Sequence, residues 1–218
     1  MAAFAVAGTS VNGAAVTVTI PSGSNLGAVM TWFYEDGGGA GAPSVPGGAT
    51  ATSIGTPAYY RSGAAYRITG LSAGSATFTP PSSGGSQACI VVVFSGMDTT
   101  GDTDTGSTFA PFGFTTPELT LDTGGTDDMV VMFVANPTTA VTLAGAGGST
   151  VRGESAGAAY GGTIGAVTRA RSGATTLIQG TTAGTTVFAF GVQIVAAGGG
   201  GGPTQPPRSL HQFRQRAA

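Results

Sequence analysis

Short apolar runs alternate with Gly-, Pro-, Ser- and Asp-rich segments along the first 197 residues. Between Val16 and Ile20, valine and isoleucine alternate with threonine, which predicts a half-buried strand. Similar strand-like runs lie at residues 28–34, 66–69, 76–79, 163–169 and 187–195. The runs Cys89–Phe94 and Met129–Val134 are apolar without interruption, which indicates central strands that are covered on both faces. No stretch before residue 203 has the apolar spacing of an amphipathic helix.

These runs predict an all-β protein of about eight to ten strands. The segment Gly70–Gly74 suggests a hairpin turn between two of the runs. In the final run, alternation places four apolar side chains on one face, which we expect in the core: Phe188, Phe190, Val192 and Ile194. The fold expected is an antiparallel β-sandwich, jelly-roll-like, with an extended C-terminal arm.

Composition excludes several classes of function. The chain has one Cys, one His and no Lys. A single Cys permits no internal disulfide, and a single His permits no His-cluster metal site. Without Lys there is neither a Schiff base nor a P-loop lysine. We therefore expect no enzyme, no cofactor and no metal. The chain should nevertheless fold, because 41% of its residues are hydrophobic.

No targeting segment is evident in the sequence. Residues 1–8 are apolar but lack the basic residues of a signal peptide. The longest apolar-rich runs, 88–94 and 187–197, are much shorter than the ~20 residues of a membrane span. We expect a protein made in a cytoplasm, with no membrane partner.

Charge and chain texture change together near residue 198. Residues 198–202 are five consecutive glycines, which is typical of a flexible linker. The segment 203–218 carries a net charge of +3, whereas residues 1–202 carry −5. We therefore predict a sandwich domain at 1–197, a linker at 198–202 and a basic docking arm at 203–218. The alternative is a frayed terminus without a partner.

The arm combines prolines, two large apolar residues and three arginines. Its prolines favour an extended start, and Ser209 is a candidate cap for a short helix. The residues expected to bind a partner are Pro206, Arg208, Leu210, Phe213, Arg214 and Arg216. Three cations are too few for firm binding to DNA, so no nucleic-acid partner is expected.

The order of segments resembles a loosely defined family of β-sandwich modules. These modules occur in tailed-phage structural proteins, such as minor tail and decoration proteins, and in bacterial surface proteins. The resemblance covers about residues 14–197 and rests on VTVTIPSG at 16–23, YRIT at 66–69, the closing FAFGVQIVAA at 188–197 and, most specifically, FSGMD at 94–98. It implies a β-sandwich fold and a place in a virion, and it supplies no catalytic residues.

Three groups of residues suggest chemistry, each with a plainer explanation. Two G-x-S-x-G matches, around Ser72 and Ser155, lack a following helix and a nearby base, since His211 lies in the arm. We expect both to be ordinary turns. The acidic loop with Asp98, Asp102 and Asp104 fails the calcium-loop pattern and is expected to be a solvated turn. The carboxylates considered for glycosidase chemistry, none of them paired by the sequence, are Glu35, Asp36, Asp127, Asp128 and Glu154.

Aromatic residues offer a candidate sugar-binding platform. Trp32, Phe33 and Tyr34 lie within one strand-like run, so alternate side chains should face the core. Tyr59 and Tyr60 precede an arginine and are expected to be more exposed. Core packing is the favoured interpretation for the first group.

The function expected is that of a structural virion protein of a tailed bacteriophage. A minor tail or tail-tip component is favoured, and a head-decoration protein is the close second. Its partners would be sister copies or other tail or capsid proteins, in an oligomer assembled in the host cytoplasm. The competing class is a carbohydrate-binding module that contacts host glycans.

Overall fold

In a computed structural model the chain is an all-β protein. The described residues are 1–34, 41–55, 62–81, 87–98, 105–110, 118–122, 128–136, 142–156, 163–170, 175–182 and 187–197. Within them there are fifteen strands and no helix, and every strand pairing is antiparallel. The predicted all-β fold is therefore confirmed.

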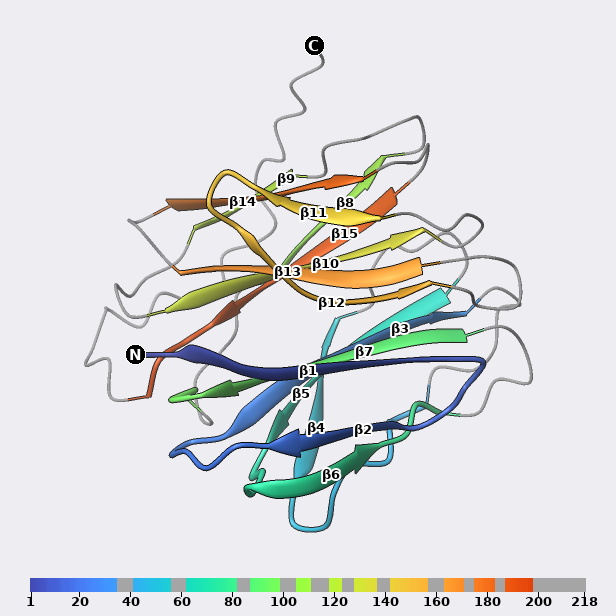
Figure 1. Cartoon of the computed structure of the whole chain (residues 1–218), viewed down its shortest axis with the longest axis vertical. Helices are drawn as coiled ribbons and strands as arrows, with labels where there is room; N and C mark the ends of the chain where they lie inside the picture. The colour runs from blue at the N-terminus through green and yellow to red at the C-terminus, as the bar shows by residue number, and fades with distance from the viewer. Residues whose placement is uncertain are drawn as a thin grey trace.

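The first half of the chain supplies seven strands in two sheets. Its five-stranded sheet has the order β1-β7-β3-β5-β4, and β2 pairs with β6 in a smaller sheet. The strands are β1 (Ala3–Val11), β2 (Val16–Ile20), β3 (Gly27–Tyr34), β4 (Thr50–Gly55), β5 (Ser62–Thr69), β6 (Gly74–Phe78) and β7 (Gln87–Ser95). In Figure 1 they occupy the lower part of the molecule.

The second half supplies eight strands, again in two sheets. Its five-stranded sheet has the order β12-β13-β10-β15-β8, and the smaller sheet has the order β11-β14-β9. The strands are β8 (Thr105–Ala110), β9 (Glu118–Asp122), β10 (Met129–Asn136), β11 (Leu143–Ala146), β12 (Thr150–Ala156), β13 (Thr163–Ala170), β14 (Thr175–Thr182) and β15 (Val187–Ile194). They form the upper part of Figure 1.

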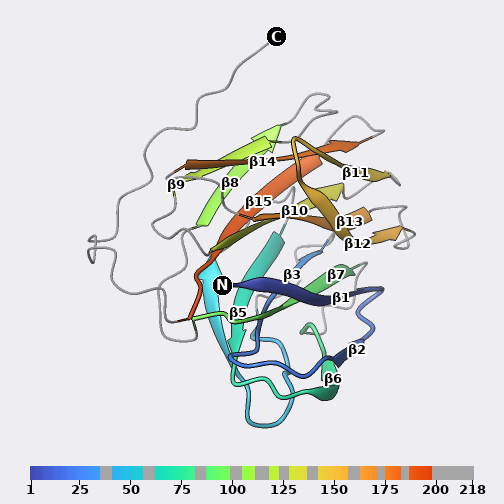
Figure 2. The same cartoon turned by 60° about the vertical axis from the view of Figure 1, so that its left-hand side comes forward.

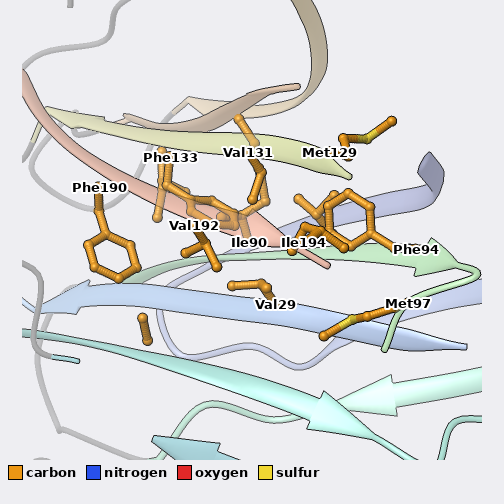
Figure 3. Close-up of a cluster of buried hydrophobic side chains, with 14 of the residues drawn as sticks. Val29, Ile90, Phe94, Met97, Met129, Val131, Phe133, Phe190, Val192 and Ile194 are labelled. Atoms are coloured by element: carbon orange, nitrogen blue, oxygen red, sulfur yellow. The ribbon is translucent and has the colours of Figure 1, made fainter. Parts of the chain in front are cut away.

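The four sheets stack as layers, with the two five-stranded sheets in the middle (Figures 1 and 2). Between these two lies the central core, to which both halves contribute (Figure 3). A second core fills the space between the first five-stranded sheet and β2–β6. A third lies between the second five-stranded sheet and β11-β14-β9. The sandwich is thus the central pair of layers, with a smaller sheet covering each outer face.

Burial follows the sequence pattern closely. In β2 the apolar residues are buried and the threonines exposed, in strict alternation. All eight residues of β10 and the first eight of β7 are buried, because cores lie on both faces of these strands. The uninterrupted apolar runs are therefore central strands, as predicted. Phe190, Val192 and Ile194 lie in the central core, and the side chain of Phe188 is outside the described residues.

Two features of the strand layout differ from expectation. The strands on either side of Gly70–Gly74 do not form a hairpin: β5 pairs with β3 and β4, while β6 pairs with β2. The turn instead carries the chain from one layer to the next. The described residues also form fifteen strands, more than the eight to ten that were predicted. Edge strands such as Thr50–Gly55 and Thr150–Ala156 were missed because they are half-exposed and rich in Gly, Ser and Thr.

Candidate functional site

The segment Phe94–Asp98 forms the joint at which the first half ends. Phe94 and Met97 are fully buried in the central core. Between them, Gly96 has a φ of 65°, in the left-handed region that favours glycine. A side chain there would also collide with the carbonyl oxygen of Met1. The FSGMD motif is thus a structural turn packed against the start of the chain.

This joint also holds the end of the body. Met97 forms an antiparallel bridge with Ala196, beyond the end of β15. The amide of Asp98 donates to the carbonyl of Val195 at 2.7 Å, and the amide of Ala197 donates to the carbonyl of Gly96 at 2.7 Å. The chain therefore leaves the body at Ala197 from a fixed point, close to its own N-terminus.

The carboxylate of Asp128 binds the same C-terminal end of the body through two further hydrogen bonds. Its Oδ1 accepts a hydrogen bond from the amide of Ala196 at 2.9 Å, and its Oδ2 accepts one from Nε2 of Gln193 at 2.7 Å. The residue is 5% exposed. The sequence offered Asp128 as an unpaired candidate carboxylate for glycosidase chemistry, with a turn before a strand as the plainer interpretation. Its role as a clamp for the last strand needed knowledge of which strands are neighbours.

The six predicted partner-binding residues lie outside the described residues. These are Pro206, Arg208, Leu210, Phe213, Arg214 and Arg216. The same holds for the linker at 198–202 and for His211. The arm and its boundaries remain predictions. The structure shows the point at Ala197 from which the linker and the arm continue, and this point is called the root of the arm.

Neither serine of the G-x-S-x-G matches has the surroundings of a nucleophile. Ser72 is exposed in the bend between β5 and β6. Ser155 is 9% exposed and lies within β12, so its segment is part of a strand and not the turn that was predicted. A nucleophile elbow requires a tight strand-to-helix turn, and the described chain has no helix in which one could end.

Two of the described candidate carboxylates, Glu154 and Asp128, hold parts of the fold together. Oε2 of Glu154 accepts a hydrogen bond from the amide of Leu143 at 2.6 Å, which ties β12 to the start of β11. Asp128 is engaged as described above, and Asp98 is half-buried in the joint. Among the residues that the structure describes, no group of three His, Cys, Asp or Glu could hold a metal ion. The other acidic candidates, Glu35, Asp36, Asp102, Asp104 and Asp127, lie outside them.

The first aromatic group belongs to the core. Trp32 is 0% exposed and Phe33 2% exposed, on opposite faces of β3. Trp32 stacks on Tyr66 with ring centroids 5.4 Å apart and an interplanar angle of 10°. Core packing is therefore confirmed for these two residues. The side chain of Tyr34 and both Tyr59 and Tyr60 lie outside the described residues.

The single cysteine is chemically sheltered. Cys89 is 1% exposed in the second core, where burial raises the pKa of its thiol far above the ordinary value. The neighbouring hydroxyl of Ser10 lowers that pKa, but less than burial raises it. The thiolate, which is the reactive form, is thus disfavoured in the folded protein.

A small hydroxyl-bearing surface covers the outside of the β2–β6 sheet. Thr17 pairs with Thr77 across the two strands, and Thr19 pairs with Ser75. All four side chains are exposed, and the hydroxyls of Thr17 and Thr77 lie 3.0 Å apart. The sequence had already indicated this threonine face.

Comparison with protein-family models, with curated proteins and with solved structures found no match to this chain. Over the described residues, no helix has the length and apolar character to cross a membrane.

Proposed function

We propose that this chain is a structural protein of a tailed-phage particle, with a rigid β body that is attached to a neighbouring subunit through its C-terminal arm. A minor tail or tail-tip position is favoured, and a head-decoration role is the close second. The proposal rests on the resemblance of the segment order around FSGMD at 94–98. It does not depend on a catalytic centre.

The observation that carries the proposal is the fixed root of the arm. Ala197 is held by Gly96, and the preceding residue is held by Asp128 and Met97. Five glycines then separate this root from the arm. Such a linker spans about 12 Å as a flexible chain and at most about 18 Å when extended. The arm can thus bind a neighbour without fixing the orientation of the body.

The chemistry of the arm matches a protein partner. Leu210 and Phe213 would supply a buried apolar anchor. Arginine guanidinium groups pair with carboxylates through two parallel hydrogen bonds, so the three arginines favour an acidic surface. The body carries a net charge of −5 over residues 1–202, which makes a sister copy one acceptor and another tail or capsid protein the second.

A truncation after Gly202 tests the proposal. The truncated chain should keep the melting temperature of the full chain and lose its place in assembled particles. The matched pair is Phe213→Asp against Gln212→Asp in the full chain, where only the first should reduce incorporation. Full incorporation of the truncated chain would refute attachment by the arm.

The exposed hydroxyls of the β2–β6 sheet favour one second candidate, a carbohydrate-binding module. Thr17, Thr19, Ser75 and Thr77 present hydrogen-bonding groups on one surface. Glycan binding that survives the truncation and is lost in Thr17→Val with Thr77→Val would support this candidate. Absence of binding to host-surface glycans would leave the structural role alone.

A further inference from the structure

The two halves of the chain repeat one topology. In the first half the five-stranded order is β1-β7-β3-β5-β4, and in the second it is β8-β15-β10-β13-β12 when counted from the opposite edge. If β1, β3, β4, β5 and β7 are matched to β8, β10, β12, β13 and β15 in turn, the first strand order becomes the second. The smaller sheets agree as well, because β2–β6 corresponds to β9–β14.

The repeat has a nearly constant length. Strands β1 to β7 begin at residues 3, 16, 27, 50, 62, 74 and 87, and their counterparts begin at 105, 118, 129, 150, 163, 175 and 187. Each counterpart therefore starts 100 to 102 residues later. The faces agree too: Val29 and Val131 lie in the central core, whereas Met30 and Met132 point to the outer cores.

The one strand without an obvious counterpart, β11, has a short equivalent. In the first half, Ser44 and Thr79 form an isolated antiparallel bridge with reciprocal backbone hydrogen bonds of 2.9 Å. In the second half, Ala144 pairs with Thr181 as part of the β11–β14 ladder. In each half, the pair joins the segment before the edge strand, β4 or β12, to the end of the corresponding strand of the smaller sheet, β6 or β14. β11 is thus an extension of a feature that both halves share.

The irregularities of two corresponding edge strands, β4 and β12, coincide, whereas the register shift of β1 has no counterpart in β8. The β4–β5 ladder shifts register between Ser53 and Gly55, where Gly55 pairs with Ala65. The β12–β13 ladder shifts between Val151 and Gly153, where Gly153 pairs with Ala166. In each half, a bulge of one residue precedes a glycine that is opposite an alanine of the central core. Bulges are specific local features, so their agreement supports a common origin of the halves.

Two contacts between the halves correspond to each other. A methyl group on Gly153 of β12 would lie 3.5 Å from Cδ1 of Ile90 in β7. A methyl group on Gly55 of β4 would lie 3.8 Å from the ring of Phe190 in β15. The strand β12 corresponds to β4, and β15 corresponds to β7. In each half, therefore, the glycine after the bulge contacts the same core strand of the other half. This pair of contacts is related as in an isologous interface around a two-fold axis, but the close approach of β1 and β7 to β12 and β13 has no equally close counterpart of β8 and β15 with β4 and β5.

We infer that the chain is a fused pair of one β module of about 100 residues, and that the five-stranded face of the module is a self-recognition surface whose partner is a second copy of the module. The central core is then a dimer interface within a single chain (Figure 3). This inference is independent of the arm and of the proposed attachment. It leaves the outer layers and the sheet edges for contacts with other proteins, because both inner faces are already covered.

A nicked full-length protein tests the inference. A protease site is placed within residues 99–104, which join the halves, and a control protein carries the site within residues 56–61, which cuts the first module between β4 and β5. Each cleaved protein is unfolded in denaturant, refolded by dilution and examined by native mass spectrometry. Both fragments are present during refolding, so pairs of unlike fragments and pairs of like fragments can all form.

The inference predicts three kinds of pair from the first protein: the original heteropair, a homopair of two first-half fragments and a homopair of two second-half fragments. In the control protein, the smaller fragment lacks β5 and β7, so it has no complete five-stranded face and should give no homopair. Introducing Gly153→Leu into the first protein should weaken the heteropair at least tenfold, whereas Gly47→Leu, in a position with open space around it, should not. Heteropairs alone would overturn self-recognition, and separate fragments would overturn the interface itself.

Discussion

Replacing Phe190 by alanine removes the side chain that links β15 to the bulge of β4. The residue is 3% exposed and lies in the central core, opposite Phe133 of β10. On the far side, its ring meets the open backbone at Gly55, which has no side chain to collapse into the space. The cavity should therefore persist after substitution.

The expected cost follows from this environment. A fully buried Phe→Ala substitution lowers the free energy of unfolding by about 3–5 kcal/mol, part from lost transfer and part from the residual cavity. Because neighbouring sheets hold the site from both sides, we expect the upper part of that range. Thr19→Ala, on the exposed face of β2, is the matched control and should cost less than about 1 kcal/mol.

Urea unfolding is the assay, followed by two signals. Far-UV circular dichroism reports on both halves, while fluorescence of Trp32, the only tryptophan, reports on the first half. Because the halves share one core, both signals should shift to lower urea together. A loss below about 1 kcal/mol, or a shift in the dichroism transition with the fluorescence transition unchanged, would refute a shared, tightly packed central core.

Three further predictions test single features of the structure. Gly96→Ala should lower stability by about 1–3 kcal/mol in thermal or urea unfolding, because it forces a left-handed backbone and a collision with Met1, whereas Gly47→Ala, with open space, should not. Asp128→Ala should cost about 1–3 kcal/mol by leaving buried donors unpaired, with Asp128→Asn less damaging. Burial raises the pKa of the Cys89 thiol in the folded state, so unfolding above the ordinary pKa of 9.0 releases a proton. Above that pH the free energy of unfolding should fall by up to about 1.4 kcal/mol per pH unit. In Cys89→Ala, the contribution of the thiol to this pH dependence should be absent.

The strand content of this fold is predictable from its alternation. The threonine and valine pattern of β2 and the continuous apolar runs of β7 and β10 gave the correct element type and the correct faces. The half-exposed edge strands were harder, because β4 and β12 carry small and polar residues that also suit loops. Which strands are neighbours was not predictable for β5 and β6, since a short turn suits a hairpin and a change of layer equally well.

The repeat itself left little trace in the residue identities. The corresponding strands GAVMTWFY (27–34) and MVVMFVAN (129–136) share only their burial pattern and two identical positions. The strand VTVTI (16–20) corresponds to ELTLD (118–122), a sequence of different character. What both copies keep is backbone geometry, such as the bulge before Gly55 and before Gly153. The joint at Gly96 and the clamp at Asp128 were likewise invisible, because each depends on contacts between distant segments.

Hydrogen–deuterium exchange, compared between the free protein and the particle-bound protein, tests the functional account most directly. A body anchored by its arm predicts new protection in peptides that cover residues 203–218, with the exchange of β7, β10 and β15 unchanged. Protection that appears on the β strands while residues 203–218 exchange as in the free protein would contradict attachment by the arm.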